Sequence, residues 1–389
     1  MTDLFIVFGD WTLRHNEPLQ AQRAALSLRR APANVLAHHH SLLLDLRAEL
    51  PIFGEITDGG LRRSAEPSLV PCANLAAHEL PLAVVALDGD MLRIIHLLTR
   101  VEKHVTHLIK APRPVAACRA EHLIDMLRDG FEANHLYLNN FECYYIKGMP
   151  DTELEQKFNI TGEYDYHVLN RQWYEALSDR RIDGFAPQLG DEIQHWAYDN
   201  DFCRIQPNPE RIAGYVSIMH WSRVRKSSWD DPVVTYKKKL YHEDALERWE
   251  RNYADQRVTG TPEESMTSFF KLPLSSLPAW RRTRYDMACE AVETGNIFMI
   301  NFEDSRVRND YSQRGRLQQC EIEYLKTRCQ PDERLIYADL AKLTDKVETF
   351  MRSIGLVCER TNYSKLTFLE EYVRERSDWR SFNERGQTA

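Results

Sequence analysis

The sequence predicts an α+β protein. A C-terminal antiparallel β-barrel with flanking helices, residues 147–375, is expected to follow a mostly helical α/β region, residues 1–146. Two observations predict this fold class. Short C-terminal segments alternate charged and apolar residues with a period of two, as strands with two unlike faces do. Longer N-terminal segments place apolar residues three and four apart, which is typical of helices.

Two distant segments carry acidic pairs at strand spacing. In Glu153-Leu154-Glu155-Gln156-Lys157 the two glutamates and the lysine share one face, and Leu154 lies on the other. Glu321-Ile322-Glu323-Tyr324 repeats this pattern. Buried carboxylates must be protonated, paired with cations or bound to a metal. The sequence therefore predicts a metal site.

The segments between them carry cations in the same alternation. Arg223 and Arg225 flank Val224, and Phe298–Glu303 alternates apolar residues with Asn301 and Glu303. Strands that close into a barrel with the polar face inward would enclose Glu153, Glu155, Glu303, Glu321 and Glu323 together with Lys157, Arg223, Arg225, Lys237, Lys239, Arg282 and Arg284. Lysine and arginine bind phosphate oxygens, and carboxylates hold hard divalent ions. Such an interior suits a polyphosphate with Mg²⁺ or Mn²⁺ and a water that attacks phosphorus.

The order of these motifs resembles the CYTH superfamily, the triphosphate tunnel metalloenzymes. The matching segments are Glu153-Leu154-Glu155-Gln156-Lys157, Arg223-Val224-Arg225, Thr235-Tyr236-Lys237, Arg282-Thr283-Arg284, Phe302-Glu303, Glu321-Ile322-Glu323 and the closing Tyr363-Ser364-Lys365-Leu366, which follows an expected helix over Leu340–Ile354. The resemblance covers residues 147 to 375. The chain departs from the family pattern at Glu303, where the family usually has Asp, and in the long segment between Lys157 and Arg223.

The resemblance implies roles for these residues. Glu153, Glu155, Glu303, Glu321 and Glu323 would hold the metal, and Lys157 would join the glutamates of both acidic pairs in catalysis. The expected phosphate-binding residues are Arg223, Arg225, Lys237, Lys239, Arg282, Arg284 and Lys365.

The expected activity is metal-dependent hydrolysis of a triphosphate-bearing compound. The sequence leaves open a nucleoside triphosphate, tripolyphosphate, thiamine triphosphate or, less favoured, an RNA 5′ end. Two alternatives also stay open. One is an adenylate cyclase, in which the ribose hydroxyl attacks phosphorus, and the other is a non-catalytic module that senses a polyphosphate.

Aromatic residues gather around the long segment between Lys157 and Arg223. These residues are Trp173, Tyr174, Trp196, Tyr198, Trp221 and Trp229. Aromatics beside arginines can stack on a nucleobase, but packing in a core is the more common role of such residues. The sequence favours packing.

The first 146 residues do not reveal a function. A strand is expected over Asp3–Leu13, and helices are expected over Leu19–Leu50, Leu92–Lys110 and Ala117–Asn134. Leu136–Ile146 reads as a strand, and a turn at Lys147–Pro150 leads into the barrel. The tail, residues 376–389, is expected to be mobile.

Three N-terminal features have simpler interpretations than a site. His38-His39-His40 and the pair His104 and His107 offer too few convergent ligands for a metal, so ordinary surface or core histidines are expected. Asp88-Gly89-Asp90 is expected to be a turn.

Composition sets outer limits on function. The net charge of −8 argues against general nucleic-acid affinity. The sequence contains no Cys-x-x-Cys pair, so neither a zinc site nor a disulfide framework is suggested. No apolar run is long enough for a membrane span, and Met1–Leu13 lacks the pattern of a signal peptide. We expect no membrane partner and a cytoplasmic location.

Overall fold

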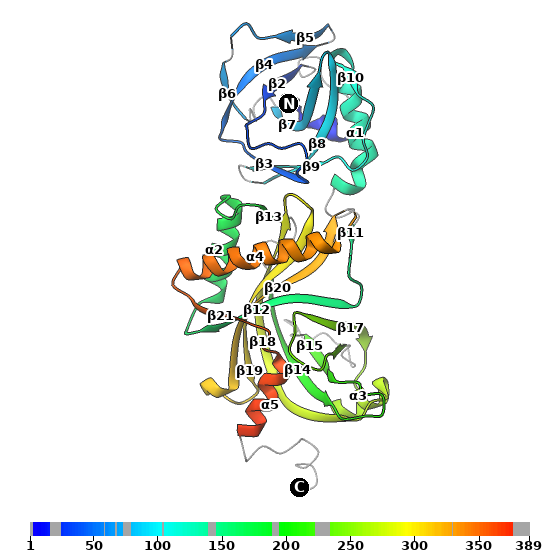
Figure 1. Cartoon of the computed structure of the whole chain (residues 1–389), viewed down its shortest axis with the longest axis vertical. Helices are drawn as coiled ribbons and strands as arrows, with labels where there is room; N and C mark the ends of the chain where they lie inside the picture. The colour runs from blue at the N-terminus through cyan, green and yellow to red at the C-terminus, as the bar shows by residue number, and fades with distance from the viewer. Residues whose placement is uncertain are drawn as a thin grey trace, which may run out of the picture.

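The computed structural model describes residues 3–15, 25–57, 59–66, 68–72, 79–102, 105–138, 145–188, 194–221, 234–328 and 330–375. Two antiparallel β-sheets follow one another along the long axis of the molecule, with the N-terminal sheet at the top of Figure 1. Helix α1 packs against the first sheet, and the other α-helices pack against the second sheet.

The first sheet has the strand order β3-β9-β8-β7-β1-β2-β4-β5, with β6 paired to β4 and β10 paired to β8. Its strands are β1 Asp3–Asp10, β2 Leu26–Arg30, β3 Ser41–Asp45, β4 Glu49–Thr57, β5 Gly60–Arg63, β6 Leu69–Pro71, β7 Glu79–Asp88, β8 Met91–Glu102, β9 Val105–Lys110 and β10 Cys118–Arg119. Short 3-10 helices, η1 Trp11–His15 and η4 Ala120–His122, join α1 Leu123–Leu138 in this region. One face of the sheet packs against α1, and the other buries a second apolar cluster.

Two of the helix predictions for this region are wrong. Leu92–Lys110 forms the hairpin β8–β9, and Leu19–Leu50, where the structure describes it from residue 25, forms β2, β3 and the start of β4. The physical reason is burial on both faces: Ile94 and Leu97 pack toward α1, while Leu108 packs into the opposite cluster. A strand that is apolar on both faces loses the period of two and can imitate a helix in sequence.

Other N-terminal expectations are confirmed. The strand expected over Asp3–Leu13 is β1, which ends at Asp10, and the helix expected over Ala117–Asn134 is α1, which begins at Leu123. Asp88 pairs with Met91 across a two-residue hairpin turn, in which Gly89 has φ +60°. The expected strand over Leu136–Ile146 is wrong at its start, which belongs to α1, and its end forms β11.

The second sheet closes into a barrel. Its strand order is β11-β20-β19-β18-β14-β15-β16-β17-β12-β21, and β20 also pairs with β12, so the strands from β20 through β18 and β14 to β12 form a ring. These strands are β11 Tyr145–Ile146, β12 Thr152–Thr161, β13 Phe185–Pro187, β14 Gln194–Ile205, β15 Gly214–Trp221, β16 Val234–Leu240, β17 Glu247–Gln256, β18 Leu274–Ala291, β19 Asn296–Val307, β20 Arg316–Arg328 and β21 Val357–Thr361. The expected C-terminal antiparallel barrel is confirmed, although the protein as a whole is mostly β.

Helices pack against the barrel. They are α2 Tyr166–Ser178, α3 Pro262–Phe270, α4 Glu333–Ser353 and α5 Lys365–Glu375, with a short 3-10 turn η5 Gln313–Gly315 before β20. Outward residues such as Phe158, Phe302 and Ile322 pack against α2 and α4 in the largest apolar cluster. Trp173 and Tyr174 of α2 belong to this cluster, whereas Trp196 is 40% exposed. Trp229 lies outside the described residues.

A buried junction joins the two sheets. Glu290 of β18 and Arg328 of β20 form a bidentate ion pair, with Nε to Oε1 at 3.0 Å and Nη2 to Oε2 at 2.9 Å. His40, in the turn before β3, lies 3.1 Å from Glu290, and Arg328 donates to the carbonyl oxygen of Tyr137 in α1 at 2.8 Å. Gly295, with φ +78°, lies against the His40 ring so closely that a Cβ there would be 2.9 Å from Nε2.

The histidines and cysteines noted in the sequence lie in different environments. His38–His40 lie in a turn rather than a helix, and His107 is buried on β9, while His104 lies outside the described residues. Six cysteines in the described part of the chain are free thiols: Cys72, Cys118, Cys203, Cys289, Cys320 and Cys358. Across the described residues, no helix combines the length and apolar character needed to cross a membrane. The tail, residues 376–389, lies outside the description.

Candidate functional site

The barrel interior collects the charged residues predicted from sequence. β12 supplies Glu153, Glu155 and Lys157, while β20 supplies Glu321 and Glu323. The other members are Glu303 of β19, Lys237 and Lys239 of β16, Arg282 and Arg284 of β18, and Lys365 at the start of α5. Each strand's alternation directs these side chains inward while its apolar residues pack under the helices. Arg223 and Arg225 lie outside the described residues.

Sequence reasoning missed three charged residues of this interior. Arg248 and Glu250 lie on β17, and Asp286 lies on β18 beyond Arg284. Arg248 and Asp286 are almost fully buried. The local signal was weaker than in the recognised motifs, because Glu247-Arg248-Trp249-Glu250-Arg251 carries charged residues on both faces of the strand.

A first ion-pair network centres on Glu155. Lys157 Nζ lies 2.7 Å from Glu155 and 3.2 Å from Glu321, which joins the two acidic strands. Arg248 also binds the Glu155 carboxylate and donates to the carbonyl oxygen of Asn362 at 2.9 Å. Lysine and arginine together outweigh the desolvation of this carboxylate and lower the pKa of Glu155 to about 2.

A second network follows β16 and β17. Lys237 Nζ lies 2.7 Å from Glu250, and Lys239 contacts Glu250 at 3.1 Å as well as Glu153. Burial and the nearby Glu155 and Glu250 carboxylates nevertheless raise the pKa of Glu153 well above its ordinary value. At Glu153, burial and the neighbouring carboxylates together outweigh the attraction of Lys239.

A third network joins β18, β19, β20 and α5. Arg282 binds Glu303 and lies 2.8 Å from Glu321, and it also donates to the Tyr198 hydroxyl at 2.9 Å. Lys365 contacts the same two glutamates, with 2.9 Å to Glu303. Burial, followed by repulsion from Arg282, lowers the pKa of Lys365.

Arg284 and Glu323 differ in how they are neutralised. Arg284 binds Asp286, with Nε to Oδ2 at 2.8 Å. Glu323 makes no hydrogen bond or ion pair with any residue in the described ranges. Burial, with the nearby Glu250 and Glu155 carboxylates, raises its pKa. Glu323 is therefore a half-buried acceptor with unused capacity.

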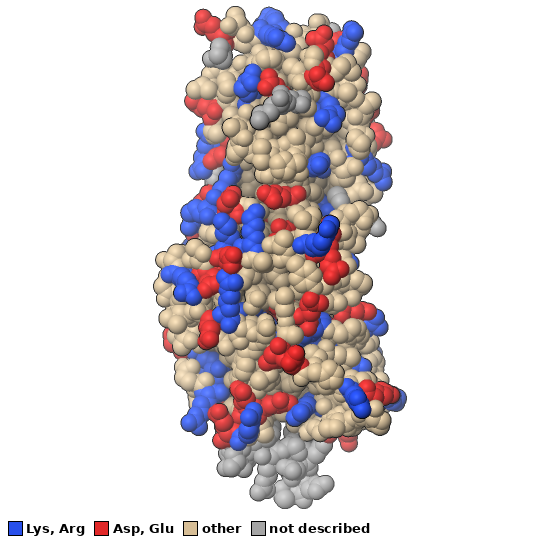
Figure 2. All heavy atoms as spheres, viewed as in Figure 1, with Lys and Arg blue, Asp and Glu red and all other residues tan. Residues whose placement is uncertain are grey.

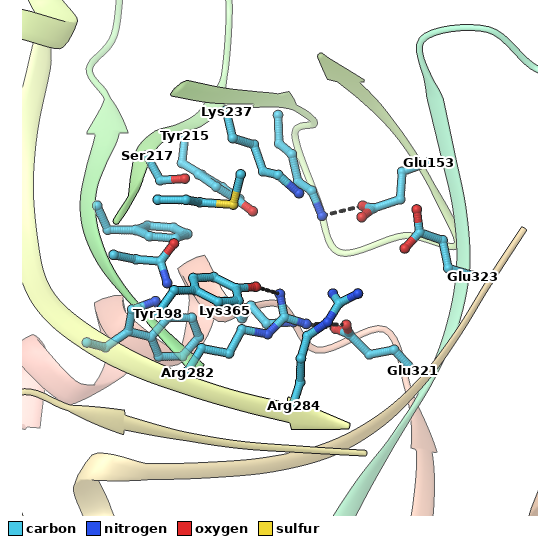
Figure 3. A pocket seen from close by; sticks show the side chains of 15 residues that line it. Glu153, Tyr198, Tyr215, Ser217, Lys237, Arg282, Arg284, Glu321, Glu323 and Lys365 are labelled. Carbon is cyan, nitrogen blue, oxygen red and sulfur yellow. Dashed lines mark hydrogen bonds and ion pairs between the residues drawn. The ribbon is translucent and has the colours of Figure 1, made fainter. Parts of the chain in front are cut away.

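These side chains surround a small cavity of about 40 Å³. Figure 3 shows Glu153, Glu321 and Glu323 on one side, Ser217, Tyr215 and Tyr198 on the opposite side, and Lys237 and Arg282 with Arg284 between them. At one end of the barrel, inward residues Phe202 and Trp280 pack against the apolar face of α5. Helix α5 thus closes that end.

The face of the molecule seen in Figure 2 does not share this concentration of cations. On the face shown in Figure 2, Lys and Arg are interspersed with Asp and Glu. The negative net charge of −8 is consequently compatible with an interior that holds many buried lysines and arginines.

Glu153, Glu321 and Glu323 form what we call the acidic wall, and their donor chemistry suits a hard divalent cation. Glu153 and Glu323 offer carboxylate oxygens, and the pKa of each is raised first by burial and then by neighbouring carboxylates, whose repulsion a cation would relieve. Lysine and arginine hold the oxygens of Glu155, Glu303 and Glu321. With these ion pairs in place, no group of three or more His, Cys, Asp or Glu in the described ranges could hold a metal ion.

Comparisons with known proteins give only weak resemblances. No protein-family model matches the chain, and no curated protein matches it. The PH1819 protein from Pyrococcus horikoshii OT3 is 15% identical, with a TM-score of 0.31 over 56% of this chain and 98% of that chain. The Schizosaccharomyces pombe Mediator head module is 10% identical, with a TM-score of 0.25 over 54% of this chain and 100% of that chain. The S. pombe Pct1 RNA triphosphatase is 13% identical, with a TM-score of 0.22 over 58% of this chain and 84% of that chain. Scores this low do not establish a shared fold, and membership of the CYTH superfamily stays a prediction from the motifs.

Proposed function

We propose that the barrel binds a triphosphate-bearing compound and hydrolyses it with the help of Mg²⁺ or Mn²⁺. The observation that carries this proposal is the pairing of phosphate-binding cations with buried carboxylates inside one closed barrel. A site that only bound anions would gain nothing from inward carboxylates, which repel a polyphosphate unless a cation intervenes.

The chain's own residues divide the work. Lys237, Lys239, Arg282, Arg284 and Lys365 line the cavity and would take the phosphate oxygens in exchange for their present carboxylate partners. Glu153 and Glu323 would hold the cation, with Glu155, Glu303 and Glu321 completing the acidic set. A divalent ion bound there would neutralise phosphate charge and lower the pKa of a water.

The test is a substrate panel with Mg²⁺ or Mn²⁺. Tripolyphosphate, nucleoside triphosphates, thiamine triphosphate and a 5′-triphosphorylated RNA are incubated with the protein, and both phosphate release and the organic product are measured. Hydrolysis predicts phosphate and a diphosphate, a cyclase would give pyrophosphate and a cyclic nucleotide, and a sensor would bind without turnover. The hydrolase proposal fails if no triphosphate releases phosphate with either ion.

Two pairs of variants connect the activity to the barrel. Glu323→Gln should lower turnover by at least about a hundredfold, because an amide binds a hard cation poorly, while exposed Glu359→Gln should not. Lys237→Ala should weaken turnover by about tenfold or more through loss of a charge-assisted bond. Lys238 is the neighbouring residue on the outer face, and Lys238→Ala is the control variant, whose turnover should not change. Full activity in both barrel variants would separate the activity from this site.

A further inference from the structure

One part of the cavity wall carries no charge. The inward residues of β14 and β15 that line the cavity are Tyr198, Asn200, Phe202, Tyr215, Ser217 and Met219. We call Tyr198, Asn200, Ser217 and Met219 the uncharged wall. Asn200 pairs with Met219 across the two strands, so these residues form one continuous patch.

Two polar side chains of the uncharged wall are buried without partners. Asn200 is 5% exposed and Ser217 is 1% exposed, and neither side chain makes a hydrogen bond with any residue in the described part of the chain. Buried amides and hydroxyls are nearly always hydrogen-bonded in folded proteins. Both line the cavity, so water or a ligand inside it can be their partner.

The uncharged wall lies between two groups of phosphate-binding cations. Ser217 pairs with Lys237 in the neighbouring strand β16, and Tyr198 pairs with Arg282 in β18. The acidic wall stands across the cavity (Figure 3). A ligand whose phosphates bind Lys237 and Arg282 would therefore place its next, uncharged part against Asn200, Ser217 and Met219.

We infer that the uncharged wall binds the nucleoside part of a nucleoside triphosphate. This inference rests on the proposed function and names its substrate class. A phenol ring and a thioether offer a surface for a planar base, while an amide and a hydroxyl match the hydrogen-bonding edge of a base or the hydroxyls of a ribose. Inorganic tripolyphosphate would leave Asn200 and Ser217 unsatisfied.

The closed end of the barrel argues against an RNA chain in the same position. Phe202 pairs with Ser217 and Trp280 pairs with Asn200, so both aromatics lie beside the uncharged wall, and α5 packs on them. A nucleotide attached at the 3′ side of the first would meet this apolar plug. The geometry favours a free nucleotide, whose length ends at the nucleoside.

Equilibrium binding with slowly hydrolysed analogues tests the inference in the presence of Mg²⁺. The β,γ-imido analogues of ATP and GTP are compared with diimidotriphosphate, which has the phosphates but no nucleoside. At least one nucleotide analogue should bind ten times more tightly than diimidotriphosphate, and equal affinities would overturn the inference without any variant.

Variants of the uncharged wall sharpen the same experiment. Asn200→Ala and Ser217→Ala should each lower the affinity for the tighter-binding nucleotide analogue by about three- to tenfold, which corresponds to the loss of one hydrogen bond. The affinity for diimidotriphosphate should change by less than about twofold. Ser268→Ala, on the exposed side of α3, is the matched control and should change neither affinity. Unchanged nucleotide affinity in both wall variants would overturn the inference even if triphosphates bind. Failure of every triphosphate to bind would remove the proposed function and the inference together.

Discussion

Glu153 and Glu155 lie two residues apart on β12 and share a face, yet their pKa values move in opposite directions. Both carboxylates are buried, which raises the pKa of each. Lys157, Lys239 and Arg248 overcome burial at Glu155 and bring its pKa to about 2, whereas Glu155 and Glu250 add to the effect of burial at Glu153. Neighbouring charges, rather than residue type, decide which carboxylate is ready to accept a cation or a proton.

This difference predicts how stability should depend on pH. The pKa of Glu153 is raised above the ordinary 4.5, so the folded protein keeps a proton that the unfolded chain loses. Stability should fall as the pH rises from 4.5 through the raised pKa. The effect of Glu155 on stability has the opposite sign, because its pKa is lowered. Its contribution to the free energy of unfolding is complete above pH 4.5 and is lost as the pH falls toward about 2.

Glu153→Gln isolates the first effect. The free energy of unfolding, measured by urea denaturation from pH 4 to 8, should match the wild type near pH 4 and exceed it increasingly above pH 4.5. Exposed Glu359→Gln should follow the wild-type curve. Parallel wild-type and Glu153→Gln curves across this range would contradict the raised pKa assigned to Glu153.

At the scale of elements, the sequence predicted the barrel's polar face well and its surroundings poorly. Alternation has a fixed period in a strand, so finding Glu153 or Arg282 on a polar face required only local sequence. Ion-pair partners depend on which strands become neighbours, and this explains why Arg248 and Asp286 were missed. In the first sheet, β8 and β9 are apolar on both faces, and the local pattern no longer distinguished strand from helix.

Strand β17 illustrates what the motifs omitted. Arg248 reaches Glu155 of β12 and the backbone at Asn362, so one side chain connects two barrel strands with the segment before α5. Arg248→Ala should cost about 3 kcal/mol in the free energy of unfolding, near the lower end for a broken buried pair, because Lys157 still contacts Glu155. Chemical denaturation measures this loss.

The matched control is the next arginine of the same strand but on the outer face. Arg251 binds Asp151 at the exposed surface, with Nε to Oδ1 at 3.1 Å. Arg251→Ala should change stability much less, since water replaces an exposed partner. Equal losses in the two variants would show that Arg248 matters for packing and not for the charge of the barrel.

At the scale of the whole molecule, the strands that hold the cavity also hold the junction. β18 carries Arg282 inside the barrel and Glu290 at its far end, and β20 carries Glu321 and Arg328 in the same way. Groups from the first region complete the buried pair, through His40 on Glu290 and the Tyr137 carbonyl on Arg328. The two sheets therefore share a desolvated charge cluster, which is costly to separate.

This sharing predicts that the two sheets unfold together. Wild-type protein should show one calorimetric transition, because undocking the first sheet would leave the Glu290–Arg328 pair without two of its partners. Glu290→Gln keeps the shape but leaves Arg328, which is 1% exposed, without its carboxylate. We expect a loss of about 3–5 kcal/mol at the junction and an earlier, separate transition for the first sheet. Glu293→Gln, whose half-exposed carboxylate lies 3.6 Å from His39, is the control and should keep a single transition. Two transitions in the wild type, or equal behaviour of the two variants, would mean that the junction does not couple the sheets, and the N-terminal region would then be free to move independently of the cavity.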